Sequence, residues 1–376
     1  MENRGGRREE SVTQISTRSG TASSSSTAWS PQTWSPGKHQ AAPGHGEIEQ
    51  RRLRKPSSAE GGEILWSYAV SIALIHGLAL FAATPWLFSW SGLVAAVVGL
   101  YVFGTLGVNL CYHRLLTHRG FKCPRRLEHF FSVLGVCCLQ DTPARWVATH
   151  RMHHQHSDEQ SDPHSPLATF LWSHVGWLVV DNRELNSLAM CDHYARDVLR
   201  DPFYLRFERN FFWLWTYLAH AALYYFVGFV AGWLSSGLFM GGVQFGLSLL
   251  VWGVFVRTVL VWHITWSVNS LTHLWGYQSY GTGENSRNNW FVALISNGEG
   301  WHNNHHADPR SASHGHKWWE LDVTFLTILA LEKLSVVRDV IRPRETAAQL
   351  SVFNPDGDSL PSADVPSADA DQRKAA

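Results

Sequence analysis

Nine of the 21 histidines lie in four short clusters whose spacing favours metal binding. The clusters are His113 and His118 (HRLLTH), His150, His153 and His154 (HRMHH), His273 (NSLTH), and His302, His305 and His306 (HNNHH). On an α-helix, residues three and four positions apart share one face, so each HxxHH cluster can offer imidazoles to two adjacent metal ions. Imidazole binds Zn, Cu, Fe and Ni, and the spacing therefore leaves the metal open.

The HRLLTH cluster has a different spacing. His113 and His118 are five positions apart, about 140° around an ideal α-helix. This separation predicts one ligand for each of two metals, near a helix end, rather than two ligands for one metal. A single histidine of this kind is more often an ordinary polar residue near a membrane surface, but the repeated clusters together predict a dinuclear metal centre.

Two long segments without any charged side chain predict the elements that carry these clusters. Residues 64–113 and residues 211–256 contain no Asp, Glu, Lys or Arg. A transmembrane helix needs about 20 apolar residues, so each segment is long enough for two crossings and a turn. The alternative, a large buried core of a soluble helical protein, explains such segments less well. The predicted spans are 64–83, 92–111, 211–233 and 243–264, with breaks at Thr84-Pro85, Ser235-Ser236-Gly237 and Gly241-Gly242.

The distribution of Lys and Arg predicts the orientation. Four basic residues, Arg51, Arg52, Arg54 and Lys55, precede the first span, and the short loops 84–91 and 234–242 contain none. Cytoplasmic segments are enriched in Lys and Arg, so both termini and residues 113–210 are predicted to be cytoplasmic. All four histidine clusters then follow an even number of crossings and lie on the cytoplasmic side.

Composition excludes several other classes of protein. The 31 Lys and Arg residues balance 31 Asp and Glu residues, so nucleic-acid binding driven by a basic surface is excluded. The five cysteines show neither a CxxC pair nor the spacing of a disulfide framework. Residues 1–60 and 346–376 are polar and rich in Ser, Pro and Ala, which predicts disordered tails around a membrane domain at 61–345. No cleavable signal peptide is expected near Met1.

These motifs, taken together, resemble the integral-membrane fatty acid desaturases, and specifically the stearoyl-CoA desaturase-like Δ9 family. The resemblance extends over roughly residues 64–345. It rests on the four histidine clusters with their neighbours, on Asp162-Pro163-His164, and on Gly298-Glu299-Gly300-Trp301 before His302. The stretch Trp318-Trp319-Glu320-Leu321-Asp322 is similar to the bacterial and plant branches of the family.

The resemblance implies an all-α membrane protein in which four transmembrane helices carry a cytoplasmic helical cap with a His-rich di-iron site. By motif, one iron would be bound by His113, His150, His154 and His305, with Asn269 acting through a water molecule. The other iron would be bound by His118, His153, His273, His302 and His306. The implied reaction uses O2 as co-substrate to insert a cis double bond, by the family's usual outcome at Δ9, into a long-chain fatty acyl group.

The resemblance also implies substrate-binding residues. In the family a bent tunnel holds the acyl chain, and Gln140, Trp146 and Thr265 occupy the positions that line its bend. Ordinary packing at a membrane interface is the simpler interpretation of each residue alone. The animal enzymes have an Arg-Asp pair before the second cluster, whereas this chain has Ala148-Thr149, so the carrier stays open among acyl-CoA, acyl-lipid and acyl-carrier protein. A separate electron donor, of the ferredoxin or cytochrome b5 type with its reductase, is expected.

The sequence also offers three carboxylates that could support the metal site, and two alternative functions. Glu299, Asp162 and Asp141 are candidates to orient the histidines and compensate the metal charge. A membrane hydroxylase or alkane monooxygenase would use similar histidine clusters and differs in forming an alcohol. A His-rich metal transporter would need ionisable residues along its spans, and these spans contain almost none.

Overall fold

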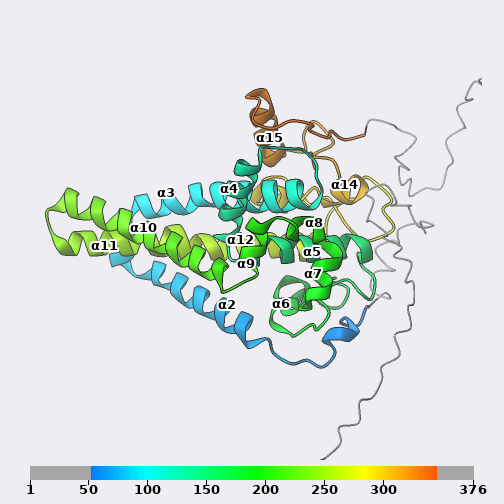
Figure 1. Ribbon diagram of the computed structural model, residues 1–376, viewed down its shortest axis with the longest axis horizontal. Helices are drawn as coiled ribbons and strands as arrows, with labels where there is room; N and C mark the ends of the chain where they lie inside the picture. Colours follow the sequence, from blue (N-terminus) through cyan, green and yellow to red (C-terminus); the bar gives the residue numbers. More distant parts are fainter. Residues whose placement is uncertain (1–51, 345–376) are drawn as a thin grey trace, which may run out of the picture. The chain divides into compact units, whose positions relative to one another are not determined.

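The computed structural model describes residues 52–344 of the 376-residue chain, and its named elements are helices (Figure 1). Four continuous helical segments are long and apolar enough to cross a membrane: Trp66–Ala83, Trp90–Thr117, Phe212–Ser236 and Phe239–Leu271. The first comprises α2 (Trp66–Ala79) and η2 (Leu80–Ala83), and the second α3 (Trp90–Gly99) and η4 (Leu100–Thr117). The third is α10, and the fourth comprises α11 (Phe239–Leu250), η6 (Val251–Val256) and α12 (Arg257–Leu271). The prediction of an all-helical protein with four candidate membrane spans is confirmed.

The second and fourth segments are longer than predicted. They contain 28 and 33 residues, which corresponds to about 42 and 50 Å of α-helix, against a hydrocarbon thickness of about 30 Å. The extra turns carry functional motifs, because His113 lies near the end of η4 and Asn269 near the end of α12. Two of the candidate membrane-spanning segments therefore also carry residues predicted to belong to the metal centre.

The α10–α11 hairpin turns more tightly than predicted. α10 ends where Gly237 adopts a left-handed conformation (φ 69°), and α11 starts two residues later. The predicted break at Gly241-Gly242 is wrong, since both glycines lie inside α11. They are needed for close packing: a Cβ atom on Gly242 would lie 2.8 Å from the carbonyl oxygen of Phe229. Small residues of this kind allow membrane helices to approach closely.

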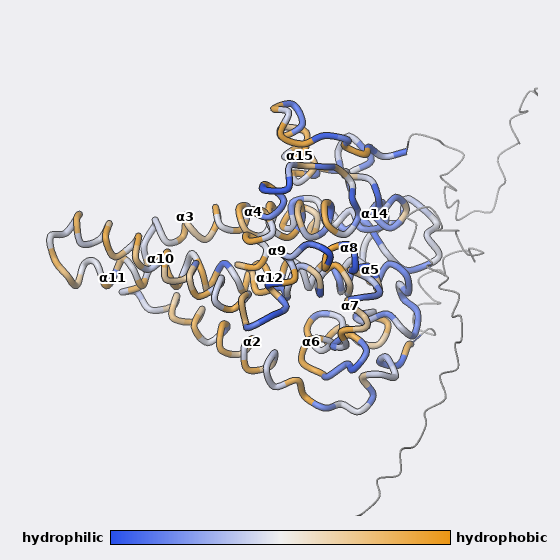
Figure 2. Tube along the Cα trace, in the orientation of Figure 1, coloured by the Kyte–Doolittle hydropathy of each residue, from blue (hydrophilic) through white to orange (hydrophobic). Residues whose placement is uncertain are grey.

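The polarity of the surface separates two regions within residues 52–344. The hydrophobic residues follow α2, α3, α10 and α11, whereas many of the hydrophilic ones gather around α5 and α14 (Figure 2). Large apolar side chains on the hairpin are exposed, including Trp215, Phe226, Leu234 and Phe239. Exposed apolar surface of this extent marks an interaction surface, and on these long helices it fits contact with lipid.

Shorter helices form the second region and position the histidines. They are α4 (Arg125–Val136), α5 (Pro143–His156), α6 (Trp177–Val179), α7 (Leu188–Tyr194), α8 (Arg196–Leu199), α9 (Pro202–Phe207), α13 (Trp290–Ile295), α14 (His302–Ala307) and α15 (Val323–Lys333). Thr142 and Pro143 start α5, because Thr142 Oγ1 accepts from Arg145 N and proline fits the first helical turn. The main apolar core joins η4 to α4 and α5, with Leu110, Leu116 and Val147 fully buried.

The predicted disordered tails fall mostly outside the described residues, which exclude 1–51 and 345–376. Residues 52–60, placed in the N-terminal tail by the prediction, are described and include a short 3-10 turn at Ser57–Ala59. The backbone N–H of Leu53 donates to the carbonyl oxygen of Leu167 at 3.2 Å. This part of the tail is therefore attached to the domain.

Candidate metal centre

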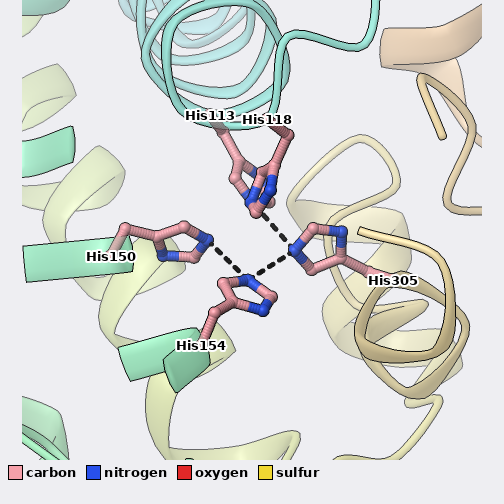
Figure 3. Close-up of side chains that lie close together, drawn as sticks. All are labelled: His113, His118, His150, His154 and His305. Carbon is pink, nitrogen blue, oxygen red and sulfur yellow. Dashed lines mark hydrogen bonds between the residues drawn. The ribbon is translucent and has the colours of Figure 1, made fainter. Parts of the chain in front are cut away.

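Five of the predicted ligands form one compact group (Figure 3). This first histidine group contains His113 and His118 from η4 and its end, His150 and His154 from α5, and His305 from α14. One ring nitrogen from each residue lies within 4.8 Å of the others. His305 Nε2 is 3.0 Å from His113 Nε2 and 2.9 Å from His154 Nε2. Three separate helices thus aim imidazole nitrogens at one point.

The place of His118 differs from the expectation. The five-residue spacing predicted that His113 and His118 would serve different metals, yet both belong to the first histidine group. The reason is that η4 is π-helical, with hydrogen bonds between residues five positions apart. The N–H of His118 donates to the carbonyl oxygen of His113 at 3.2 Å, and the two rings lie 4.9 Å apart. One π-helical turn, rather than an α-helical one, puts them on the same face.

The other four predicted histidines form a second histidine group beside the first. It contains His153 from α5, His273 after α12, and His302 and His306 from α14. His302 Nε2 lies 3.1 Å from His273 Nε2 and 3.0 Å from His306 Nε2. The rings of His154 and His306, one from each group, stack with centroids 4.4 Å apart. The HxxHH clusters on α5 and α14 therefore divide between two adjoining groups, as their spacing predicted.

Buried carboxylates fix three of the imidazole rings. His113 Nδ1 hydrogen-bonds to Glu299, His153 Nδ1 to Asp162 at 3.0 Å, and His273 Nδ1 to Asp158 at 2.9 Å. A ring that donates from Nδ1 to a carboxylate keeps a lone pair on Nε2, which is the form that binds a metal. Glu299 and Asp162 thus orient histidines as predicted, and their compensation of a metal charge stays a prediction.

Imidazole nitrogens without a hydrogen-bond partner show whether the site suits a metal ion. His153 Nε2 and His118 Nε2 are buried and have no hydrogen-bond partner within the described structure. Buried polar atoms are rarely left without a partner, and converging lone pairs repel each other unless a cation lies between them. The two groups consequently have the donor chemistry of a site for two metal ions.

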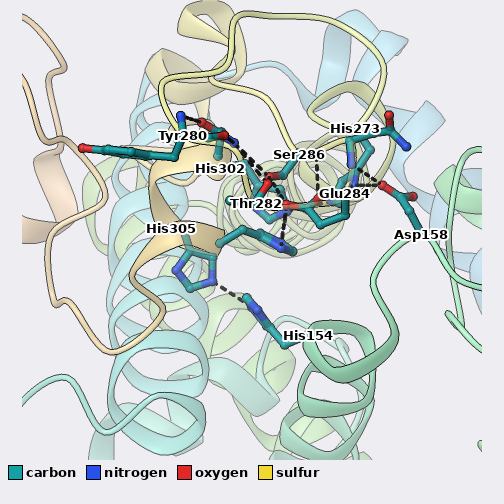
Figure 4. A network of polar contacts seen from close by, with 12 residues as sticks. His154, Asp158, His273, Tyr280, Thr282, Glu284, Ser286, His302 and His305 are labelled. Atoms are coloured by element: carbon teal, nitrogen blue, oxygen red, sulfur yellow. Dashed lines mark hydrogen bonds and ion pairs between the residues drawn. The ribbon is translucent and has the colours of Figure 1, made fainter. Parts of the chain in front are cut away.

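The sequence did not reveal some of the carboxylates. Glu284, in the loop before α13, lies beside His273 (Figure 4), 3.7 Å from its Nδ1. Glu284 is also 3.6 Å from His306 Nδ1. Asp158 lies two residues after the end of α5 and four positions after His154, and this spacing was the one available signal for it. Asp141, in contrast, accepts from the Tyr68 hydroxyl at 2.8 Å instead of orienting a histidine.

Two further buried histidines adjoin the groups. The His314 ring lies 4.3 Å from that of His305, and its Nδ1 is 3.4 Å from Glu299 Oε2. The His164 ring lies 4.4 Å from that of His153. His164 belongs to the Asp162-Pro163-His164 motif, whereas His314 had no sequence signal beyond its residue type.

Burial sets the protonation of the site. It lowers the pKa of His302, His305 and His306 well below the usual value, with further lowering by the neighbouring imidazoles. These rings are therefore neutral, as metal ligands must be. His273 is the exception: burial acts to lower its pKa, but the Asp158 carboxylate outweighs this and raises it to about 9. A metal ion that binds His273 therefore has to displace a proton from its ring.

Glycines in the Gly298-Glu299-Gly300 motif allow the chain to place Glu299. Gly298 has a φ of +119°, and a Cβ on it would lie 2.3 Å from Asp322 Oδ1. A Cβ on Gly300 would lie 2.0 Å from the backbone nitrogen of Ala293. Only glycine fits these two positions without displacing the backbone or Asp322.

The structure brings one of the predicted substrate residues, Trp146, into contact with the first histidine group. Gln140 Nε2 donates to Thr265 Oγ1 at 2.8 Å, which joins the start of α5 to α12. The Trp146 ring stacks on His150 with centroids 5.0 Å apart. Asn269 is half-buried on α12, one turn before His273, and its backbone oxygen accepts from Ser173 Oγ. The roles of these residues remain predictions.

Comparison with known proteins gives a consistent result. Residues 84–326 match the family described as "Fatty acid desaturase". The chain is 40% identical over 278 residues to the sn-1 stearoyl-lipid 9-desaturase of Anabaena variabilis, covering 74% of this chain and 94% of the relative. It is 40% identical over 295 residues to the acyl-CoA C20 Delta5-desaturase of Anemone leveillei, covering 78% and 85%. It is 42% identical over 291 residues to the chloroplastic palmitoyl-monogalactosyldiacylglycerol delta-7 desaturase of Arabidopsis thaliana, covering 77% and 72%.

Proposed function

The chain belongs to the fatty acid desaturase family and acts as a fatty acyl desaturase. From this premise we propose that it inserts a cis double bond at C9 of a long-chain acyl group. We propose that the two histidine groups hold the two irons that this reaction uses. The observation that carries the proposal is the convergence of nine histidines into two adjoining groups. The C9 position is supported by the relatives named as 9-desaturases, although other relatives are named for Delta5 and delta-7.

The reaction needs an oxidant that is stronger than any amino-acid side chain. Two bound irons and O2 provide the oxidising power to remove hydrogen from unactivated methylenes, which no amino-acid side chain can do. The first histidine group would hold one iron and the second group the other, with Asn269 assisting through a water molecule. Glu299, Asp162 and Asp158 keep the rings of His113, His153 and His273 in the ligating tautomer.

The protein must also position the substrate. A polymethylene chain carries no chemical landmark, so the position of the double bond is set by where the chain bends relative to the metals. We place this bend at the Gln140–Thr265 hydrogen bond and at Trp146, which contacts His150. The contact between the Trp146 ring and His150 supports this assignment.

Replacing Trp146 by Ala tests the bend. The variant removes a large ring that contacts Tyr112, His113 and His150, so the acyl chain can lie straighter beside the metals. We expect an activity loss of about tenfold or a shifted double bond, with iron content unchanged, measured by gas chromatography with mass spectrometry and by metal analysis. Trp233→Ala, on the exposed side of α10, is the control. A wild-type rate and product position in Trp146→Ala would refute the bend.

We further propose that both termini and the metal centre face the cytoplasm, where a separate donor of the ferredoxin or cytochrome b5 type delivers electrons. The support is the absence of Lys and Arg from residues 84–91 and 234–242, both described.

Cysteine labelling tests this orientation. Ser236 and Asp192 are exposed, at the α10–α11 turn and on α7. A membrane-impermeant maleimide should label Ser236→Cys in intact cells and Asp192→Cys only after permeabilisation. Four of the native cysteines are buried and the fifth is half-buried, and the unmodified chain gives the background. Labelling of Asp192→Cys in intact cells would reverse the topology.

The function itself is tested by expression in a host that lacks unsaturated fatty acids. A cis-Δ9 alkene in the total fatty acids is the expected product, and its position is found by mass spectrometry of dimethyl disulfide adducts. A hydroxylated product, or an alkene at another carbon, would overturn the corresponding part of the proposal.

A further inference from the structure

The segment that joins α4 to α5 holds Gln140 in an unusual backbone conformation. Leu139 and Asp141, on either side of Gln140, have φ angles of 51° and 67°, in the left-handed region. This region is uncommon for residues with a side chain, and a bulky residue such as Leu adopts it only where surrounding contacts hold it there. The position of Gln140 therefore depends on contacts from outside the segment.

Two side chains of α12 provide such contacts. Arg257 Nη1 donates to the carbonyl oxygen of Cys137 at 2.9 Å. Trp262 Nε1 donates to the carbonyl oxygens of Cys138 at 2.8 Å and Leu139 at 3.2 Å. Three successive carbonyl groups of the segment are thus bound by one helix. The two donor residues, Arg257 and Trp262, are called the α12 clamp below.

The cation of the α12 clamp is buried inside the fourth candidate membrane-spanning segment. Arg257 is fully buried, and within residues 52–344 it takes part in no ion pair. Its Nη2 donates to His220 Nε2 at 3.2 Å, and its guanidinium carbon lies 4.4 Å from the centre of the Phe103 ring. An ionisable residue in a membrane-spanning segment is costly and usually has a function. The contacts of Arg257 connect that function with the segment that carries Gln140.

The same helix also binds the side chain of Gln140. Gln140 Nε2 donates to the carbonyl oxygen of Val261 at 3.3 Å and to Thr265 Oγ1 at 2.8 Å. Val261 directly precedes Trp262, and Thr265 follows Trp262 within one helical turn. The backbone before Gln140 and the amide of Gln140 are consequently fixed to one turn of the same helix.

We propose that the α12 clamp sets the position of the double bond, because it fixes the place at which the Gln140 amide meets Thr265. Arg257 and Trp262 are positioning residues in this assignment, since they act through Gln140. When the clamp is weakened, Leu139 can return to an ordinary backbone conformation and the Gln140 amide moves. Another pair of methylenes then lies beside the metals. This inference rests on the proposed function and adds to it the contacts that hold the bend in place.

Variants of the α12 clamp test this assignment in the full chain, expressed in a host that lacks unsaturated fatty acids. Trp262→Phe keeps most of the ring but removes both bonds from Nε1, and Arg257→Gln removes the charge and the bond to Cys137. Mass spectrometry of dimethyl disulfide adducts gives the share of each positional isomer. We expect the share of product with its double bond away from the wild-type carbon to rise about fivefold, the factor that one neutral hydrogen bond is worth, with iron content unchanged. A defect in folding alone would lower the amount of product without changing the ratio of isomers.

A double variant tests whether the α12 clamp acts through Gln140. Gln140→Leu alone should change the ratio of isomers, and adding Trp262→Phe should change it no further, because two substitutions that act through one contact are not additive. Trp252→Phe is the matched control. It removes an indole donor of the same membrane-spanning segment, but one that binds the carbonyl oxygen of Leu87 at 3.1 Å rather than the α4–α5 segment. Its ratio of isomers should equal that of the wild type.

The possible outcomes separate the inference from the proposed function. A wild-type ratio of isomers in Trp262→Phe would overturn the inference, and it would do so even if Arg257→Gln failed to fold. Additive changes in the double variant would also overturn it, because the α12 clamp would then act by a route other than Gln140. An alcohol instead of an alkene from the unmodified chain would overturn the proposed function itself.

Discussion

Replacing His305 by Ala should abolish the formation of unsaturated product. His305 is fully buried, and its Nε2 lies within about 3 Å of ring nitrogens from both η4 and α5. Removing it opens the first histidine group at the point where three helices meet. Loss of outer contacts to metal ligands already costs about 10- to 100-fold, so loss of a ligand should reduce product at least 100-fold.

Metal content separates this explanation from simple misfolding. We expect iron to fall from about two to about one per chain in His305→Ala, because the second histidine group is intact, while the amount of protein in the membrane stays similar. His156→Ala is the matched control: it removes a histidine from α5, two residues after His154, that belongs to neither group. Full activity with two irons in His305→Ala would refute the assignment of the site.

The residues with a local signal could be predicted from the sequence. Charge-free segments predicted the four candidate spans, because a membrane helix needs a long apolar stretch. The HxxHH spacing on α5 and α14 predicted the division of each cluster between two groups, because α-helical geometry holds there. His118 was expected apart from His113 because the same geometry was assumed for η4, which is π-helical, and its ring lies in the first histidine group. The metal that it binds stays a prediction.

The carboxylates around the histidines depend on contacts between distant residues. Asp158 and His273 are 115 positions apart, and Glu299 is 186 positions from His113. Glu284 lies in a loop without periodicity, so no pattern marks it as a neighbour of His306. Such pairings arise from the tertiary packing of α5, α12 and α14, and a single sequence does not encode them in any local spacing.

Replacing Arg114 by Met should destabilise the whole protein. Arg114 is fully buried near the end of η4 and forms ion pairs with Glu299 at 2.7 Å and Asp322 at 2.8 Å. It also donates to the carbonyl oxygen of Ala312 at 2.7 Å. A Met of similar length leaves two buried carboxylates without their cation, and breaking a buried pair in this way costs about 3–5 kcal/mol. We expect the melting temperature to fall on the order of 10 °C.

The control for Arg114→Met is Arg196→Met. Arg196 pairs with Asp192 at 2.5 Å, but both side chains are mostly exposed to solvent. Exposed ion pairs contribute little, so this variant should melt at the wild-type temperature. If both variants melted alike, the buried network would not be a main support of the fold.

The pH dependence of Arg114→Met gives the network a distinct signature. In the wild type, burial acts to raise the pKa of Glu299, but Arg114 and His113 outweigh this and lower it, so its stabilising contribution is lost only below about pH 4.5. Without Arg114, burial should raise the pKa of Glu299 above its unfolded value. The folded form of Arg114→Met then binds more protons than its unfolded form, so the free energy of unfolding of this variant should increase as pH falls from 8 to 6. In the wild type, the contribution of Glu299 to the free energy of unfolding stays constant over this range. Melting temperatures of the two proteins should therefore converge over this range, and a constant difference would mean that Arg114 acts through packing rather than through its charge.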